Sequence, residues 1–122
     1  MTDSAEHVIF VYGTLKRGFH NHALLANSKF VGTGRVPGFD LFRAGIPFAV
    51  PGDGEIHGEL FSVSDSVLAR LDALEGHPTW YRRTPVTVTV AESVENVIQR
   101  EAEMYVYQGG GRGELVPDGV YR

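Results

Sequence analysis

The sequence predicts an α+β fold, a small mixed β-barrel of about six strands with one main helix packed beside it. Two observations lead to this prediction. Short segments with apolar runs or strict apolar–polar alternation, which are typical of strands, recur along the 122 residues. Only one segment has strong helical periodicity, and the strands do not alternate with helices as in a parallel α/β sheet. A chain of this length has room for one core, so residues 1–122 are expected to form a single domain.

Six segments carry the strand pattern. The first is a continuous apolar run that ends at Gly13, as expected of a strand buried on both faces. The fifth alternates cleanly, and Pro85 places its start at an edge or a bulge. The turn-forming residues Pro37-Gly38 and Pro51–Gly54 separate others. In chain order the predicted strands are His7–Tyr12, Phe30–Val36, Phe39–Arg43, Ile56–Val63, Thr84–Val90 and Glu103–Tyr107.

Two weaker helical segments and two tails complete the prediction. His22–Asn27 and Ser93–Arg100 have helix-compatible patterns. Residues 1–6 are polar and residues 109–122 are rich in glycine. Both ends are therefore expected to be mobile tails, the second one unless it packs back on the barrel.

The strong helix is predicted over Asp65–Glu75. Ser64 is a suitable N-cap before it, and Gly76 is a suitable residue to end it. At about 100° per residue, its apolar side chains form one stripe that should face the core. That stripe comprises Val67, Leu68, Leu71 and Leu74.

Glu75 projects into this apolar stripe, between Leu68 and Leu71. A carboxylate there must be desolvated, paired or used in chemistry, and the C-terminus of a helix disfavours a negative charge. Both effects raise its pKa, as a general base working near neutral pH requires. The alternative is a side chain that bends out to water at a frayed helix end. Asp72, one turn earlier, is interpreted as solvated or ion-paired.

A glycine-containing loop, Tyr12–Gly18 (YGTLKRG), follows the first predicted strand directly. Glycine at a strand end lets the backbone turn and present successive N–H groups, an arrangement that suits an anion. Because the phosphate-binding pattern GxxxxGK[ST] is absent, a carboxylate fits better than a phosphate. Lys16 and Arg17 would add positive charge, although their side chains are expected to be solvated. An ordinary strand-to-loop turn is the alternative interpretation.

Adjacent aromatic residues, Trp80 and Tyr81, lie in the connection Gly76–Arg83 after the helix. Such side chains can form the wall of a small-molecule pocket, and the phenol can hydrogen-bond a ligand. They could equally cover one end of the barrel.

Composition argues against several other classes of function. With a net charge of −4 and no basic run, no nucleic-acid partner is expected. The absence of cysteine removes disulfides, thiolate metal sites and a cysteine nucleophile. The five histidines show no metal-ligand spacing and no GxSxG marks a serine hydrolase, so neither a metal site nor a serine hydrolase triad is expected. No segment has the length of a membrane span or the form of a signal peptide, so a cytoplasmic protein without a membrane partner is expected. A monomer or weak dimer is expected as well.

The sequence resembles the gamma-glutamyl cyclotransferase superfamily, and most of all its gamma-glutamylamine cyclotransferase and AIG2-like branch. The likeness covers about Val8–Tyr107. A YGTLKxG loop combined with a downstream glutamate at a helix end is far more specific than either feature alone. The matching blocks are VYGTLKRG at 11–18 with Asn21-His22 after it, Val36–Gly38, Gly45–Pro47, Gly58–Phe61, and LDALEGHPTWYRRT at 71–84.

The resemblance implies an activity and the residues that perform it. Such enzymes cyclise a gamma-glutamyl group by attack of its own α-amine on the γ-carbonyl, which releases 5-oxoproline and an amine and needs no cofactor. It implies Glu75 as the general acid and base and Tyr81 as a residue that lines the pocket and orients the substrate. The substrate α-carboxylate would be held by the backbone of the loop Tyr12, Gly13, Thr14 and Leu15. A non-catalytic domain that binds a small molecule through the same loop is the alternative function.

Two departures from the branch leave the leaving amine open. His20 stands before Asn21 where the branch often has proline, and Gly76-His77 occupies a variable position beside the expected leaving-group site. The loop also differs from the YGSL type of the glutathione-specific branch. A lysine side chain, a simple amine or a biosynthetic intermediate therefore all remain as leaving groups, and glutathione is a poor candidate.

Overall fold

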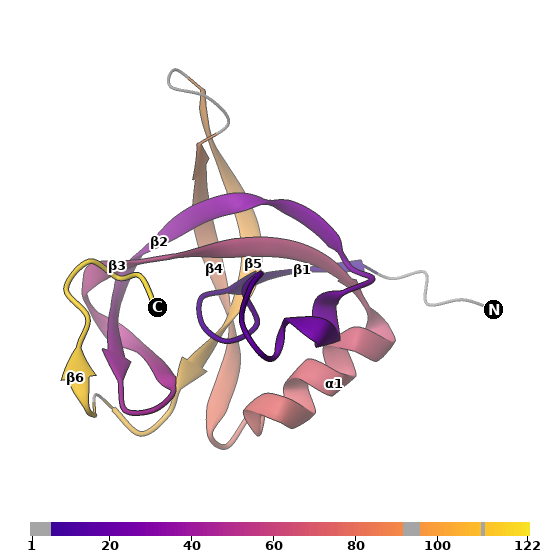
Figure 1. Cartoon of the computed structure of the whole chain (residues 1–122). Coiled ribbons are helices and arrows are strands. Elements are labelled where there is room, and N and C mark those ends of the chain that lie inside the picture. Colours follow the sequence, from indigo (N-terminus) through magenta and orange to yellow (C-terminus); the bar gives the residue numbers. More distant parts are fainter. Residues whose placement is uncertain (1–5, 92–95, 111) are drawn as a thin grey trace.

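The computed structural model describes residues 6–91, 96–110 and 112–122. These residues form a mixed sheet, one α-helix and one short 3₁₀ helix (Figure 1). The predicted fold class is confirmed. In chain order the elements are β1 (Glu6–Val11), η1 (His22–Leu25), β2 (Lys29–Arg43), β3 (Pro47–Ser64), α1 (Asp65–Glu75), β4 (Tyr81–Ala91), β5 (Val97–Tyr107) and β6 (Glu114–Leu115).

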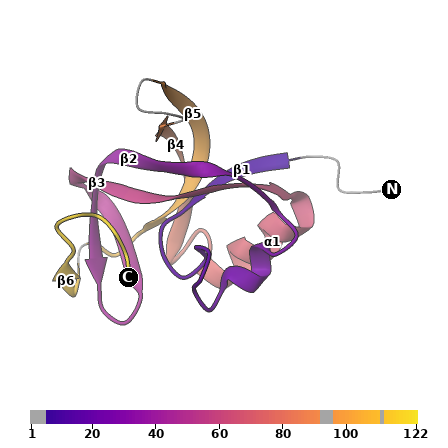
Figure 2. The same cartoon turned by 45° about the horizontal axis from the view of Figure 1, so that its top comes forward.

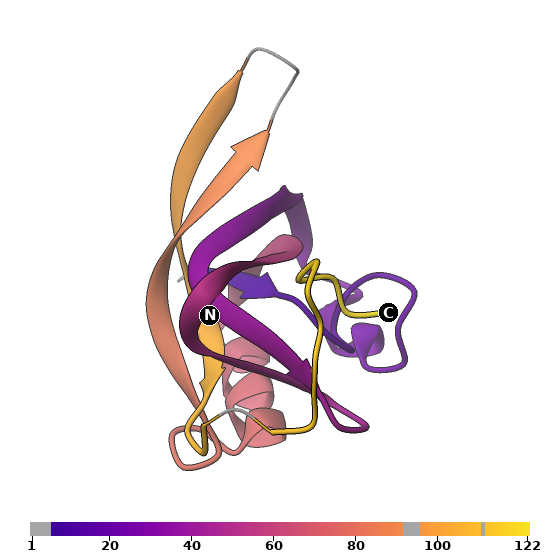
Figure 3. The ribbon, with the colours of Figure 1, turned by 90° about the vertical axis from the view of Figure 1, so that its left-hand side faces the viewer.

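The strands form one sheet that closes on itself. Their order is β3-β1-β5-β4-β2-β6, and the additional pairing of β2 with β3 closes the ring. The neighbours are antiparallel except for β1 and β5, which run parallel. η1 packs beside α1 on one side of the ring (Figure 2). The far ends of β4 and β5 extend beyond the ring as a hairpin (Figure 3).

The ends of α1 form as the sequence predicts. Ser64 caps the first turn, because its hydroxyl accepts a hydrogen bond from the Val67 N–H at 3.3 Å. Gly76 ends the helix in the left-handed conformation, with a φ of 64°. No helix in the described residues is long and apolar enough to cross a membrane.

The apolar stripe of α1 is shorter than predicted. Leu68 and Leu71 are buried, whereas Leu74 is 45% exposed. The helix leaves the core in its last turn, so the stripe ends at a rim instead of continuing against the sheet. Leu74 and Glu75 are consequently placed at the edge of a cavity.

The prediction of two strands around Pro37-Gly38 is wrong, because β2 runs through both. Gly38 has a φ of +89° and lies at a shift in register between β2 and β3. The predicted turn Pro51–Gly54 likewise lies inside β3. It bulges toward Asp40, whose carboxylate accepts a hydrogen bond from the Gly54 N–H at 2.9 Å. Since both strands bulge at the same place, these residues bend a long hairpin instead of ending it.

The predicted helix at Ser93–Arg100 is also wrong where it can be tested. Residues 93–95 lie outside the described residues, and residues 97–100 belong to β5. The helix-compatible pattern arose because this end of β5 is exposed on both faces, so burial imposes no strict alternation on it. The predicted helix His22–Asn27 is present as the short 3₁₀ turn His22–Leu25.

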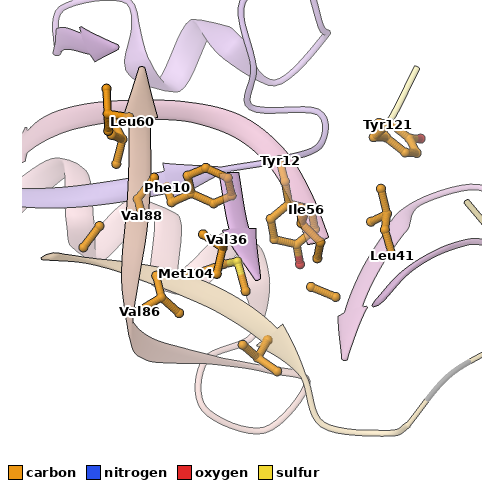
Figure 4. Packing of buried hydrophobic residues seen from close by; sticks show 14 of the residues in the cluster. Phe10, Tyr12, Val36, Leu41, Ile56, Leu60, Val86, Val88, Met104 and Tyr121 are labelled. Atoms are coloured by element: carbon orange, nitrogen blue, oxygen red, sulfur yellow. The ribbon is translucent and has the colours of Figure 1, made fainter. Parts of the chain in front are cut away.

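Two clusters of buried side chains hold the structure together. The first fills the inside of the ring, where Phe10 packs with Leu60, Val88 and Met104 (Figure 4). The second lies between the sheet and the helices and includes Ile9. Because side chains alternate along a strand, β1 contributes to both clusters and is buried on both faces, as predicted. β1 therefore ends in the interior of the molecule.

The segment after Gly109 returns to the sheet. β6 pairs with the end of β2. Val116 and Tyr121 are both buried in the cluster inside the ring. Figure 3 shows this last part of the chain running along one side of the molecule. Of the two alternatives for this tail, the structure shows the packed one; residues 1–5, the greater part of the other expected tail, lie outside the described residues.

Candidate active site

A cavity of about 140 Å³ lies where the loop after β1, the β2–β3 connection, the end of α1 and the start of β4 meet. The fold brings together here all the site residues that the sequence singles out, although they come from distant parts of the chain. These are Tyr12, Gly13, Thr14, Leu15, Glu75 and Tyr81. The other lining residues are Phe10, Val11, Asn21, Ile46, Pro47, Leu74 and Tyr105.

Glu75 borders the cavity on the side of α1. It is the last residue of the helix, and Gly76 turns the chain away directly after it. Burial raises the pKa of the Glu75 carboxyl to about 7. No basic side chain in the described residues forms an ion pair with this carboxyl. An unpaired carboxyl group that gains and loses its proton near neutral pH can act both as a base and as an acid.

The loop after β1 offers backbone donors to the same cavity. The described backbone hydrogen bonds leave the N–H groups of Gly13, Thr14 and Leu15 unused. The loop is fixed from behind by Asn21, whose Nδ2 donates to Thr14 Oγ1 at 2.9 Å and whose backbone N–H donates to the Thr14 carbonyl at 3.0 Å. The Lys16 N–H closes the turn on the Gly13 carbonyl at 3.1 Å. Successive free N–H groups in a fixed turn can bind an anion.

Gly13 is required because the β2–β3 connection packs against it. A Cβ atom at this position would collide with Cγ of Pro47. Pro47 and its neighbour Ile46 thereby form the cavity wall opposite the loop. Sequence reasoning gave these two residues no role; the signal for them is the block Gly45–Pro47, which lies in the expected order within the family resemblance.

The hydroxyl groups of two tyrosines in the cavity donate their protons to backbone carbonyls. The Tyr81 hydroxyl donates to the Pro47 carbonyl at 2.7 Å, and the Tyr12 hydroxyl donates to the Tyr105 carbonyl at 2.6 Å. Burial, and then the charge of Glu75, raises the pKa of both phenols, so both stay protonated. Since each proton is already engaged, each oxygen can only accept a hydrogen bond from a ligand.

Tyr105 is a lining residue that sequence reasoning missed. Its hydroxyl donates to Asp72 Oδ1 at 2.6 Å, and Arg83 Nη1 donates to the two oxygens of Asp72 at 3.0 and 2.8 Å. Asp72 is thus ion-paired, as predicted. This network links α1, β4 and β5 behind Glu75. Its signal in the sequence is weak, because a strand pattern at Glu103–Tyr107 does not show which end of the strand reaches a cavity.

Lys16 and Arg17 differ in their surroundings. Lys16 is only 9% exposed, and its Nζ donates to the carbonyl of Tyr121 at 2.8 Å, so the expectation that it is solvated is wrong. Burial lowers the pKa of the Lys16 ammonium. Arg17 is exposed and pairs with Glu59 at 3.4 Å. Among the residues that the structure describes, no group of three or more His, Asp or Glu side chains could hold a metal ion.

Comparison with known proteins agrees with this geometry. Residues 9–122 match the family described as gamma-glutamyl cyclotransferase, AIG2-like. The chain belongs to this family. The match includes the β1 loop, Glu75 and Tyr81, and it confirms the resemblance seen in the sequence.

Relatives in this family span nearly the whole chain. A candidate gamma-glutamylcyclotransferase from Methanocaldococcus jannaschii is 38% identical over 118 residues, which cover 93% of this chain and 94% of that protein. A gamma-glutamylcyclotransferase family protein from Escherichia coli K12 is 34% identical over 101 residues, 82% of this chain and 81% of its own. The crystal structure of an AIG2-like protein from Mus musculus is 32% identical, with a TM-score of 0.80, and the alignment covers 96% of this chain and 88% of that one.

Proposed function

We propose that the protein converts a gamma-glutamyl amine, or a related gamma-glutamyl conjugate, to 5-oxoproline and a free amine. The observation that carries the proposal is the unpaired Glu75 carboxyl, whose pKa burial raises to about 7, in a cavity that also presents free backbone N–H groups. Membership of the gamma-glutamyl cyclotransferase, AIG2-like family supports it.

The substrate carries its own nucleophile, so the protein needs to position it and move protons. The N–H groups of Gly13, Thr14 and Leu15 hold the substrate α-carboxylate. The Tyr81 oxygen, whose proton is bound to the Pro47 carbonyl, accepts a hydrogen bond from the α-ammonium. Together these contacts fold the glutamyl chain so that its amine faces its own γ-carbon.

Glu75 performs both proton transfers. Its carboxylate takes a proton from the α-ammonium, and the neutral amine attacks the γ-carbonyl carbon to form a tetrahedral intermediate. The protonated Glu75 then gives the proton to the leaving nitrogen as the carbon–nitrogen bond breaks. The ring nitrogen loses its second proton to the released amine, which departs as an ammonium ion. One ring-forming C–N bond replaces the amide C–N bond, and the carboxylate is regenerated for the next turnover.

The test is the release of 5-oxoproline, followed by mass spectrometry. Wild-type protein and the Glu75→Gln variant are incubated with gamma-glutamyl-ε-lysine, a gamma-glutamyl alkylamine, a gamma-glutamyl amino acid and glutathione. We expect wild-type protein to release 5-oxoproline from at least one conjugate other than glutathione, and Glu75→Gln to be slower by about 10²-fold or more.

The matched control is Glu101→Gln on β5. Glu101 is an exposed carboxylate that accepts a hydrogen bond from Thr87, outside the cavity. This variant should retain wild-type turnover. Turnover that survives in Glu75→Gln would remove Glu75 from the reaction. Binding of a gamma-glutamyl conjugate with no release of 5-oxoproline by the wild type would favour the alternative, a non-catalytic binding domain.

A further inference from the structure

A second cavity, of about 490 Å³, lies beside the first one. Ile46, in the β2–β3 connection, lines both cavities. Aromatic rings extend the wall that Ile46 forms between the two cavities. The rings of Phe48 and Tyr81 stack with their centroids 6.2 Å apart, and those of Tyr81 and Tyr107 are 5.4 Å apart. Since Tyr81 lines the first cavity while Phe48 and Tyr107 line the second, the two spaces share a wall.

A large aromatic side chain is exposed at this second cavity. Trp80 is 67% exposed, although its backbone is fixed. Its N–H donates to the Gly76 carbonyl at 3.0 Å, and its carbonyl accepts from the Gln108 N–H at 2.9 Å. Gly76 follows Glu75 directly, so Trp80 is held close to the proposed general base. An exposed aromatic ring on a fixed backbone, beside an exposed Ile46, favours an apolar ligand, which would remove both side chains from water.

Arg112 brings positive charge to the same cavity. Its guanidinium lies over the ring of Phe48, 5.5 Å from the centroid, and Nη1 donates to the Tyr107 hydroxyl at 3.1 Å. In the described part of the chain no carboxylate pairs with it, whereas Arg83 on β4 pairs with Asp72. A guanidinium held on an aromatic face keeps N–H donors for a carboxylate ligand.

We propose that the second cavity binds the leaving amine of the substrate, and that this amine has a large apolar body with an anionic group at its far end. The proposal rests on the function proposed above. With the γ-carbonyl beside Glu75, the atoms beyond the scissile nitrogen extend past Ile46. The apolar body then packs against Trp80 and Phe48, and the anion reaches Arg112.

The position of this subsite fits the bond that breaks. The γ-carbon–nitrogen bond lies at the junction of the two cavities, and the leaving nitrogen takes its proton from Glu75. The 5-oxoproline ring stays in the first cavity, and the free amine departs through the second. The specificity of the reaction therefore depends on residues that carry out no proton transfer.

Three conjugates distinguish the apolar part of the subsite, at Trp80, from its anion-binding part, at Arg112. Gamma-glutamyl-phenylalanine has both an aromatic body and a carboxylate, gamma-glutamyl-phenethylamine has only the aromatic body, and gamma-glutamyl-glycine has only the carboxylate. The value of kcat/KM is measured for each conjugate with wild-type protein, Arg112→Gln and Trp80→Ala. Arg100→Gln is the control, because Arg100 is an exposed arginine on β5 that does not line the second cavity.

We expect Arg112→Gln to lower kcat/KM for gamma-glutamyl-phenylalanine about tenfold and to leave gamma-glutamyl-phenethylamine within about twofold. Trp80→Ala should lower kcat/KM about tenfold for both aromatic conjugates and leave kcat/KM for gamma-glutamyl-glycine unchanged. Arg100→Gln should match the wild type throughout. An equal loss for both aromatic conjugates in Arg112→Gln, or a wild-type preference for gamma-glutamyl-glycine, would overturn the proposal.

A binding measurement separates failure of this inference from failure of the proposed function. Trp80 is the single tryptophan of the chain, so its fluorescence reports directly on the second cavity. If no conjugate yields 5-oxoproline, the proposed function fails, and gamma-glutamyl-phenylalanine is then titrated into wild-type protein and Arg112→Gln. Binding that Arg112→Gln weakens about tenfold supports the subsite. Absence of binding, or equal binding by both proteins, overturns it.

Discussion

Replacing Glu75 by glutamine removes an ionisable group whose charge the fold disfavours. The pKa of the carboxyl is about 7 in the folded protein, against an ordinary value of 4.5. One unit of pKa corresponds to about 1.4 kcal/mol, so ionised Glu75 destabilises the folded state by about 3 kcal/mol at high pH. Because the folded-state pKa is the raised one, the stability that the folded protein has with Glu75 protonated is fully present below pH 4.5. It is lost as the pH rises through 7.

Glutamine keeps the shape of the side chain and cannot ionise. Between about pH 5.5 and pH 8, the wild type is therefore expected to lose about 2 kcal/mol of unfolding free energy that Glu75→Gln keeps. Urea unfolding at the two pH values, followed by circular dichroism, measures this difference. The exposed Glu101→Gln substitution serves as the matched control and should follow the wild type at both pH values.

Parallel losses of stability in the wild type and Glu75→Gln would refute the reasoning, because the carboxyl would then titrate as it does in water. A variant less stable than the wild type at pH 8 would also refute it. That result would mean that the ionised Glu75 makes a stabilising contact. The experiment needs no substrate, so it tests the environment of Glu75 independently of the proposed reaction.

Two further predictions concern the first cavity, and a third concerns Lys16 in the loop after β1. The value of kcat/KM should fall about tenfold per pH unit below about pH 7, because protonated Glu75 cannot take the substrate's proton; a pH–rate profile that is flat between about pH 5 and 7 would contradict this. Gly13→Ala forces a methyl group against Pro47 and should raise KM about tenfold while lowering the unfolding free energy by about 1–3 kcal/mol. Steady-state kinetics and urea unfolding measure both effects, and an unchanged KM would remove Gly13 from the substrate site. Lys16→Met takes the donor from the Tyr121 carbonyl and should cost about 1 kcal/mol in urea unfolding. Wild-type stability in that variant would show that the hydrogen bond contributes nothing.

Much of the site was predictable from signals within short segments of the sequence. The bounds of α1 follow from a serine cap and a terminating glycine, and both signals act within one turn of the helix. Helical periodicity alone then placed Glu75 on the buried side. The loop after β1 was recognisable for the same reason, since a glycine after a buried strand restricts where the chain can go. The prediction of site residues was therefore best where neighbours in sequence are neighbours in space.

Contacts between distant segments account for what the sequence did not reveal. Whether Pro37-Gly38 ends a strand or bends it depends on β3, which bulges directly opposite these residues. Tyr105 and Pro47 enter the first cavity only because β5 and the β2–β3 hairpin close the ring around it. Lys16 is buried because the last part of the chain folds back over it. None of these pairings leaves a periodic signal in its own segment.

The closed sheet is weakly paired between β2 and β4. The two strands pair in register at Arg35 and Thr89, whereas β4 and β5 pair along the whole length of β4. Gly34 permits the approach, since a Cβ there would lie 2.6 Å from Cγ1 of Val88. Because few hydrogen bonds join β2 to β4, separating these two strands should cost less free energy than separating β4 from β5. The amide protons at the junction should therefore exchange with solvent earliest among those of β2 and β4. The ring is thus a closed sheet with one weak join, and β1, whose end leads into the first cavity, lies on the side opposite that join.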